Sequence, residues 1–298
     1  MATVNDWAAG ARPRTLPMAV SPVVIGAAAA LSLLTEGAGL GWQPWVIAVL
    51  ALVVALALQV GVNYANDYSD GVRGTDDVRV GPMRLTATGT VPASQVKQAA
   101  FLSFGVAALA GLGIVVLSGM WWMLAVGAVS VLAAWWYTGG KNPYGYLGLG
   151  ELMVFIFFGL VATLGTTYAM AAEVSAAAVA GAVSHGLIAA ALLMANNIRD
   201  IPTDAEVGKK TLAVRLGQTG ARWTYAVMLA AAVLLPLLLV PLSAWYLLTA
   251  VSWIFCLGPV RITLVRRRTG PGLIPVLQQT SMVGLVFAAG FSAAVLLA

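Results

Sequence analysis

The sequence contains little charge and almost no cysteine or histidine. Only 9% of its 298 residues are Asp, Glu, Lys or Arg, whereas soluble domains carry about 25%. The single cysteine, Cys256, excludes an intrachain disulfide and a cysteine-based metal site. The single histidine, His185, lies in an apolar run, where a neutral packed side chain is a simpler interpretation than a functional one. Because 60% of the residues are hydrophobic, the sequence predicts a polytopic membrane protein.

Nine apolar runs are each long enough, or nearly so, to cross a bilayer, which takes about 20 residues. The first run is longer than the apolar part of a signal peptide, so we expect a retained helix. The sequence therefore predicts an all-α polytopic membrane protein with one domain, residues 1–298. The predicted spans are 16–34, 43–64, 99–118, 121–138, 152–171, 175–195, 223–242, 244–260 and 273–297.

Charged residues are divided unevenly between the two ends of these spans. If the N-terminus is cytoplasmic, segments 1–15, 65–98, 139–151, 196–222 and 261–272 face the cytoplasm and contain all sixteen basic residues. The opposite connections contain only Glu36 and Glu173. The positive-inside rule thus predicts a cytoplasmic N-terminus, an outside C-terminus and cytoplasmic motif loops at about 65–98, 139–151 and 196–222.

The same distribution explains the basic isoelectric point, about 9.6, without a nucleic-acid partner. Most basic residues follow from the topology. The run Arg266–Arg268 is expected to anchor that topology or to contact anionic lipids of the bilayer.

Two polar stretches, each at the end of an apolar span, share one pattern. An Asn is followed four residues later by an Asp, which places both on one face of a helix end, and another Asp follows one turn on. Carboxylate and amide oxygens suit Mg²⁺, and nearby Lys and Arg supply the charge that a diphosphate needs. The pattern predicts a Mg²⁺ site for a diphosphate leaving group, next to an apolar groove for its hydrocarbon. The two sets are Asn63, Asp67 and Asp70, and Asn196, Asp200 and Asp204.

Three other interpretations compete with this one. Any one of these acids could be a solvated loop residue, but two matching sets favour a site. A transporter would carry ionisable groups near the middle of its spans, whereas here they crowd one edge. A CDP-alcohol phosphatidyltransferase also uses Mg²⁺ and Asp clusters, but its Asp-Gly-x-x-Ala-Arg signature is missing.

Longer stretches of the chain resemble a known family. Asn66, Asp67, Asp70 and Asp76, paired with Asp200 and Asp204, resemble the motifs of the UbiA superfamily of intramembrane prenyltransferases. Its menaquinone branch, the 1,4-dihydroxy-2-naphthoate polyprenyltransferases, is similar in the stretches Arg79–Arg84, Tyr137–Glu151 and Asn196–Gly217. Position 74 departs from the pattern, because many members carry a third Asp where this chain has Gly74. Asp76 and Asp77 are the alternative third ligands.

The resemblance implies nine helices around a central cavity with both motifs at its cytoplasmic mouth, in the plasma membrane. It implies Mg²⁺-dependent transfer from a polyprenyl diphosphate to 1,4-dihydroxy-2-naphthoate, with loss of diphosphate and CO₂ to give demethylmenaquinone. The alternative acceptor is 4-hydroxybenzoate or homogentisate. The motifs specify neither the donor's chain length nor the oligomeric state.

The resemblance also implies roles for individual residues. The catalytic acids Asp67, Asp70, Asp200 and Asp204 bind the metal together with Asn63, Asn66, Asp76 and Asn196. The substrate-binding residues are Arg73, Arg79, Lys141, Lys209 and Arg215, with Arg14 and Arg84 for the acceptor carboxylate. Tyr137 and Glu151 orient the acceptor or take its proton.

Overall fold

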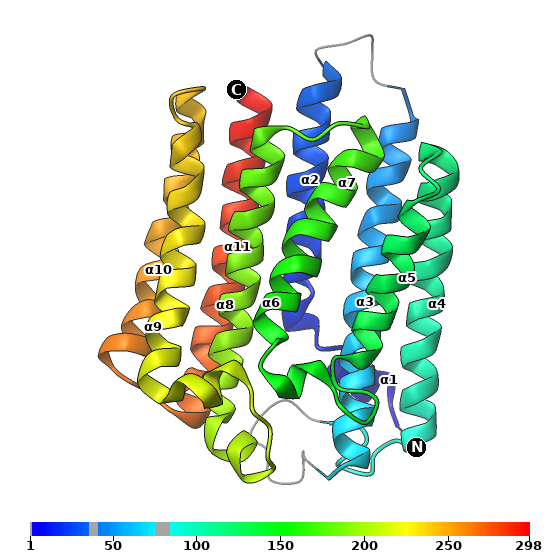
Figure 1. The fold of residues 1–298 in the computed structure, drawn as a ribbon, viewed down its shortest axis with the longest axis vertical. Coiled ribbons are helices and arrows are strands. Elements are labelled where there is room, and N and C mark those ends of the chain that lie inside the picture. The colour runs from blue at the N-terminus through cyan, green and yellow to red at the C-terminus, as the bar shows by residue number, and fades with distance from the viewer. Residues whose placement is uncertain (1, 36–40, 75–83) are drawn as a thin grey trace.

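The computed structural model describes residues 2–35, 41–74 and 84–298, and within these ranges all regular secondary structure is helical. The helices follow the long axis of an elongated bundle, and the two chain ends lie at its opposite ends (Figure 1). This confirms the predicted all-α architecture. In chain order the elements, with η marking 3₁₀ and π segments, are α1 (Val4–Ala11), η1 (Pro13–Thr15), α2 (Pro17–Thr35), α3 (Gln43–Val72), α4 (Ala93–Ser118), α5 (Met123–Trp136), η2 (Tyr144–Leu147), α6 (Gly150–Val154), η3 (Phe155–Val161), α7 (Ala162–Ala171), α8 (Ala176–Glu206), α9 (Leu212–Leu234), η4 (Leu235–Leu239), η5 (Ala244–Ala250), α10 (Val251–Val260), η6 (Arg261–Val265), η7 (Gly270–Leu273) and α11 (Ile274–Leu297).

Eight helical stretches in the described part of the chain are long and apolar enough to cross a membrane. The remaining apolar helix, α5, has 14 residues. It is therefore about 21 Å long, shorter than the hydrocarbon core of roughly 30 Å. The ninth span stays a prediction, although α5 lies where it was expected. The eight stretches are Pro17–Leu34, Gln43–Val72, Ala93–Ser118, Gly150–Ala171, Ala176–Glu206, Leu212–Leu239, Ala244–Val265 and Gly270–Leu297.

Both polar motifs continue helices instead of beginning loops. α3 runs through Asp70 to Val72, and α8 runs through Asp204 to Glu206. Hydropathy falls where the polar residues begin, but helical backbone hydrogen bonding continues for about two to three further turns. Within the predicted motif loops 65–98 and 196–222, residues 65–72, 93–98, 196–206 and 212–222 are therefore helical. The cytoplasmic position of these loops stays a prediction.

Helix α8 belongs to the largest buried cluster, which also includes side chains of α2, α9, α10 and α11. Its buried face is rich in small residues, including Gly181, Ala182, Gly186 and Ala190. Small side chains let membrane helices approach closely, and this packing holds them together in lipid. A second cluster joins α1, α3, α4 and α5, and a third joins α2, α3, α4 and α7. The bundle thus has separate packed regions, and the candidate site lies between them.

One close approach lies where η3 packs against α8. A Cβ atom at Gly159 would lie 2.5 Å from the Cα of Gly186 and 2.7 Å from the carbonyl oxygen of Ala182. Both are backbone atoms, which cannot swing aside as the end of a long side chain can. Gly159 therefore sets the distance between η3 and α8, and with it the position of Phe157 and Phe158 beside the cavity described below.

Replacing Gly159 with Ala should destabilise the protein by about 1–3 kcal/mol, because the added methyl group overlaps backbone atoms of α8. Thermal unfolding in detergent measures this. The matched control is Gly105→Ala in α4, where nothing lies within 4 Å of the new Cβ. The control should unfold at or above the wild-type temperature, since Ala favours a helix. Identical melting of Gly159→Ala and wild type would contradict the packing argument.

Candidate active site

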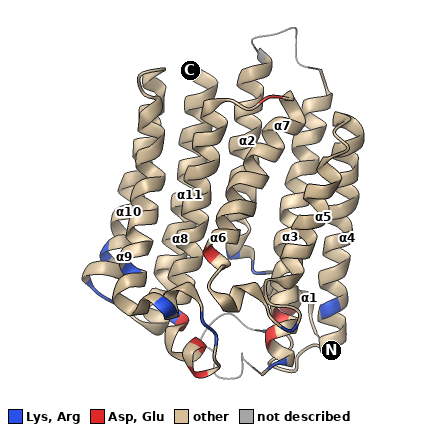
Figure 2. Ribbon diagram, viewed as in Figure 1, with Lys and Arg blue, Asp and Glu red and all other residues tan. Residues whose placement is uncertain are grey.

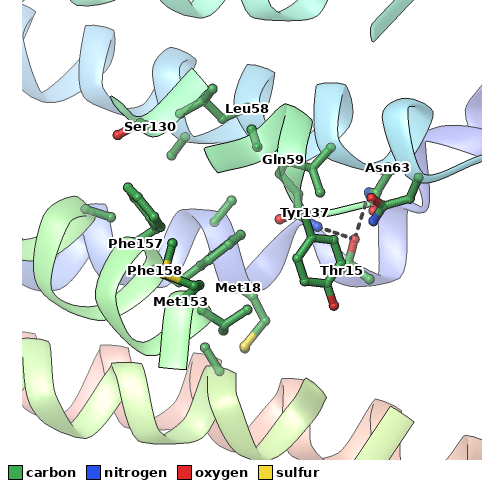
Figure 3. A pocket seen from close by; sticks show the side chains of 18 of the residues that line it. Thr15, Met18, Leu58, Gln59, Asn63, Ser130, Tyr137, Met153, Phe157 and Phe158 are labelled. Atoms are coloured by element: carbon green, nitrogen blue, oxygen red, sulfur yellow. Dashed lines mark hydrogen bonds between the residues drawn. The ribbon is translucent and has the colours of Figure 1, made fainter. Parts of the chain in front are cut away.

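A cavity of about 1580 Å³ lies within the bundle between α3 and α8. It is larger than typical ligand pockets of roughly 300–1,000 Å³. Its lining follows α3 from Ala51 to Asp70, which corresponds to about 28 Å of helix. Apolar side chains such as Leu58, Phe157 and Phe158 surround one part (Figure 3), and polar side chains gather where α3 and α8 carry their motifs. The shape suits a long apolar ligand with one charged end.

The motif on α3 presents three side chains to this cavity. Asn63, Asn66 and Asp70 line it, and their spacing of three and four residues places them on one face of the helix. Asn66 Oδ1 accepts a hydrogen bond from Thr138 Oγ1 at 2.8 Å. This bond joins α3 to the segment that follows α5, so two walls of the cavity are held together at its polar end.

Asp67 has different contacts from the other motif residues on α3. Its side chain is only 1% exposed, and it is not among the described residues that line the cavity. Asp67 Oδ2 accepts from the Leu85 amide at 2.8 Å, and Oδ1 accepts from the Thr86 amide at 2.9 Å. The carboxylate therefore holds the turn that contains Arg84. Metal binding by Asp67 stays a prediction.

Three side chains from separate segments converge on Asp70. Tyr146 Oη donates to Asp70 Oδ1 at 2.5 Å, and Lys209 Nζ lies 3.6 Å from the same oxygen. Arg84 Nη2 lies 3.8 Å from Asp70 Oδ2. The Lys209 ammonium also lies 4.5 Å from the centre of the Tyr146 ring, a cation–π contact. Asp70, Arg84 and Lys209 are all buried, so these contacts replace water around the carboxylate.

The motif on α8 carries its own basic partner. Asn196, Asp200 and Asp204 line the cavity. Arg199 holds Asp200 with two bonds, from Nε to Oδ1 at 2.6 Å and from Nη2 to Oδ2 at 2.7 Å. Its Nη2 also donates to Asn196 Oδ1 at 2.8 Å. This bidentate geometry is the strong form of an arginine–carboxylate pair, so Arg199 fixes two of the predicted ligands.

The segment between α1 and α2 closes the cavity on a third side through Thr15. Thr15 Oγ1 donates to the Arg12 carbonyl at 2.9 Å. Its hydroxyl has one proton, so it must accept from Gln59 Nε2 at 3.0 Å and Asn63 Nδ2 at 3.2 Å (Figure 3). These bonds orient both amides. They leave Gln59 Oε1 buried and without a partner among the described residues.

The two residues predicted to orient an acceptor differ in position. Tyr137 lines the cavity, and its ring meets Tyr144 edge-on with centres 5.5 Å apart. Glu151 does not line the cavity. Its Oε1 accepts a hydrogen bond from Asn197 Nδ2 at 2.9 Å, and Asn197 lines the cavity. Burial raises the pKa of the Tyr144 hydroxyl, which donates to the Ala133 carbonyl at 2.8 Å. Tyr144 therefore stays protonated and acts as a fixed donor.

The predicted basic residues divide into two groups. Arg14, Arg84 and Lys209 line the cavity. Arg73 donates to the carbonyls of Thr138 and Gly140, so it braces the segment that contacts Asn66. It is not among the described lining residues.

Arg215 and Lys141 also lie away from the cavity wall. Arg215 donates to the carbonyls of Lys210 at 3.1 Å and Leu147 at 3.0 Å, which ties η2 to the start of α9. Lys141 is exposed. The predicted residues Asp76 and Arg79, and the alternative Asp77, lie outside the described residues.

The donors at the polar end suit a metal that is shared with a ligand. No group of three or more His, Cys, Asp and Glu residues in the described ranges is placed to hold a metal ion by itself. Mg²⁺ needs only one or two carboxylates when substrate phosphates complete its coordination. The described lining holds five basic and three acidic side chains, an excess of two positive charges. A diphosphate ester carries more negative charge than this excess neutralises, which leaves a place for a divalent cation.

Several site residues could not be recognised from motif spacing. Tyr146 lies within the stretch Tyr137–Glu151, and Arg199 is one of the basic residues of segment 196–222, but motif spacing indicates no contact with an acid for either. Thr15 and Gln59 are single polar residues beside or within apolar runs. A polar residue inside a predicted span is itself a signal for function, and Gln59, four residues before Asn63, could have been found that way.

The chain matches the UbiA prenyltransferase family over residues 19–273. It is 49% identical over 291 residues to the 1,4-dihydroxy-2-naphthoate octaprenyltransferase of Mycobacterium tuberculosis, covering 97% of this chain and 96% of that protein.

Solved structures show the same fold. The apo structure of a UbiA homologue from Aeropyrum pernix K1 superposes with a TM-score of 0.71 and 18% identity, covering 94% of this chain and 97% of the homologue. A UbiA homologue from Archaeoglobus fulgidus bound to DMAPP and Mg²⁺ has a TM-score of 0.67 and 15% identity, covering 97% of this chain and 98% of the homologue.

Asp67→Asn should loosen the turn after Arg84, because an amide side chain can accept only one of the two bonds from Leu85 and Thr86. We expect amide exchange at Leu85 and Thr86 to rise at least tenfold, which corresponds to losing a bond to a charged group worth about 1.5–3 kcal/mol. Hydrogen–deuterium exchange measures this. Asp204→Asn is the matched control and should leave exchange at these amides unchanged. Unchanged exchange in Asp67→Asn would refute the structural role.

Proposed function

Because the chain belongs to the UbiA prenyltransferase family, we propose that it transfers a polyprenyl group from a polyprenyl diphosphate to 1,4-dihydroxy-2-naphthoate. The products are diphosphate, CO₂ and demethylmenaquinol, the hydroquinone form that a separate two-electron oxidation converts to demethylmenaquinone for menaquinone biosynthesis. The name and coverage of the mycobacterial relative support this acceptor. The observation that carries the proposal is that Asp70 and Asp200, on helices far apart in the sequence, line the polar end of one largely apolar cavity.

The donor's diphosphate binds at the polar end of the cavity. Arg84 and Lys209 lie there beside Asp70, at 3.8 and 3.6 Å from its carboxylate oxygens. Both line the cavity, so they place positive charge where the diphosphate would bind. The prenyl chain follows the apolar lining along α3, past Leu58 and Ala51.

The residues that would hold Mg²⁺ are the motif oxygens facing the cavity. The homologue bound to DMAPP and Mg²⁺ supports the choice of metal. When bound, Mg²⁺ supplies positive charge against the negative charge that grows on the departing diphosphate. Asp67 and Asp76 are further proposed ligands, and the backbone bonds of Asp67 also hold Arg84 in place. The cavity-facing set is Asn63, Asn66, Asp70, Asn196, Asp200 and Asp204.

In the reaction the allylic C–O bond breaks, and its electron pair leaves with the diphosphate. The electron-rich naphthoate ring then forms a C–C bond to the allylic carbon. The ring regains aromaticity as the bond to the carboxylate breaks and CO₂ departs. Arg14, on the cavity wall, is the proposed partner of the acceptor carboxylate. Tyr137 and Glu151, the latter acting through Asn197, are proposed to orient the ring or take its proton.

The proposal includes the topology of the protein in the plasma membrane, with nine spans and the site on the cytoplasmic side. Lys and Arg lie toward the end of the bundle that carries the site (Figure 2). Glu173 lies in the connection between α7 and α8, at the opposite end. The positive-inside rule supports a cytoplasmic position for the basic end.

The direct test uses the purified chain in liposomes with Mg²⁺, 1,4-dihydroxy-2-naphthoate and polyprenyl diphosphates of graded length. Mass spectrometry should detect demethylmenaquinol, or demethylmenaquinone after its oxidation in air, and EDTA should abolish its formation. Parallel reactions contain 4-hydroxybenzoate or homogentisate. Product with one of these acceptors and none with the naphthoate would overturn the proposed acceptor.

Asp200→Ala should lower turnover by about 100-fold or more, since it removes a metal ligand and leaves Arg199 without its carboxylate. Asp67→Ala should also abolish turnover while the protein still inserts. Product formation per folded protein is the measurement. Glu173→Ala, an acid removed at the other end of the bundle, is the control and should keep wild-type activity. Near-normal activity of either Asp variant would refute the metal assignment.

Tyr146→Phe should raise the Mg²⁺ concentration for half-maximal turnover about 10- to 100-fold, because it removes the bond that orients Asp70 but keeps the ring beside Lys209. A Mg²⁺ titration of the initial rate measures this. Tyr144→Phe is the matched control, because that hydroxyl bonds to the Ala133 carbonyl and not to an acid. Equal Mg²⁺ dependence of the two variants would show that Tyr146 does not orient a metal ligand.

A further inference from the structure

The last third of the chain carries positive charge without any acid. Residues 207–298 contain eight Lys and Arg and no Asp or Glu. Arg266, Arg267 and Arg268 are consecutive and lie in the connection between η6 and η7. Figure 2 shows blue segments at the outer edge of the bundle, beside α9 and α10. Acids of this part of the chain therefore cannot neutralise these arginines.

A buried arginine shapes this connection. Arg222 on α9 is 5% exposed, and it donates to the Thr263 carbonyl at 2.7 Å and the Arg268 carbonyl at 2.6 Å. The Arg268 amide in turn donates to the Ile262 carbonyl at 3.4 Å. These bonds fix the backbone of the connection from both sides, so the three guanidinium groups extend from a defined loop.

The three arginines surround one shallow recess, together with Thr269 and Gly272. All three are exposed, and none forms an ion pair with an acid in the part of the chain that the structure describes. None of them lines the cavity of the candidate active site. The recess therefore offers several guanidinium donors to an anion from outside, and phosphate is the group that such forks bind best.

Exposed apolar side chains lie along η6 and α10, next to this recess. Val265 in η6 is 73% exposed, and Leu257 and Ile254 in α10 are 70% and 68% exposed. In a chain that crosses the bilayer these side chains contact acyl chains. A ligand that meets both the arginines and this surface has an anionic head and a hydrocarbon tail, which distinguishes a lipid from a free anion.

We propose that the recess formed by Arg266, Arg267 and Arg268 binds the phosphate headgroup of an anionic phospholipid, whose acyl chains lie along α10. Arg222 is a positioning residue that holds the loop. The proposal is independent of the prenyl-transfer reaction, because the recess and the cavity share no residue.

The test measures lipid binding to the full chain purified in detergent. Native mass spectrometry counts retained lipids during titration with phosphatidylglycerol or phosphatidylcholine. Wild type should retain phosphatidylglycerol preferentially. The triple variant R266Q/R267Q/R268Q should bind it on the order of 10- to 100-fold more weakly, since each basic residue contributes about 1 kcal/mol to such contacts. Equal retention by wild type and the triple variant would overturn the proposal.

A matched pair of single variants separates a built site from general positive charge. Arg267→Gln and Arg261→Gln remove the same charge from nearby positions, but only Arg267 lines the recess. Arg267→Gln should weaken phosphatidylglycerol binding several-fold, and Arg261→Gln should not. Equal losses of phosphatidylglycerol binding in the two variants would contradict a specific site and indicate only a general effect of positive charge. These variants also keep the test decisive if the triple variant does not fold.

The source of the phosphate is distinguished by adding inorganic phosphate in place of lipid and measuring thermal unfolding. Phosphatidylglycerol should raise the melting temperature of wild type and not that of the triple variant, whereas phosphate at the same concentration should raise neither. Stabilisation by phosphate equal to that by lipid would replace the proposed lipid site with a free-anion site.

Discussion

The structure depends on keeping ionised carboxylates inside a bundle with little water. Moving an unpaired carboxylate from water into an apolar interior is very costly, so each buried acid needs close hydrogen-bond donors or cations. Asp67 accepts hydrogen bonds from two backbone amides, and Asp200 accepts two from Arg199. Asp70 accepts one from Tyr146 and lies near the cations Lys209 and Arg84. Arg199 lies beside Asp200 on α8, but the donors to Asp67 and Asp70 come from segments that are distant in the sequence. The acids thus assemble the polar end of the cavity before any ligand binds.

The same constraint explains why the cavity is both large and mostly apolar. Helices α3 and α8 each extend into the polar region, so their motif residues face one another while their apolar turns continue into the membrane. The close packing of Gly159 against α8 keeps η3 near one wall, and the separate clusters leave open space between them. Charge is concentrated at one end and hydrocarbon-like surface extends for most of the length, which matches the two parts of a prenyl diphosphate.

The sequence predicted the helical membrane fold and most of the cavity-facing motif residues, because both follow from local patterns. Hydropathy marked the spans, and the four-residue spacing of Asn63 and Asp67 correctly indicated helix ends. The spacing could not predict that Asp67 and Asp70 have different contacts. Those contacts come from residues 85 and 146, which are near the two acids only in the folded chain. The bonds from Arg73 and Arg215 to backbone carbonyls were unpredictable for the same reason. A motif names residue types, but the direction of each side chain depends on what packs against it.

The basic residues at the site differ in their distance from the carboxylates that they contact. Arg199 holds Asp200 at 2.6 and 2.7 Å, a geometry that leaves little reason to exchange partners. Arg84 and Lys209 lie 3.8 and 3.6 Å from Asp70, beyond ordinary hydrogen-bond length. A diphosphate carries more negative charge than one carboxylate, so it would attract both cations, while Tyr146 still donates to Asp70. Ligand binding and metal binding would then support each other, because each neutralises the charge that the other leaves exposed.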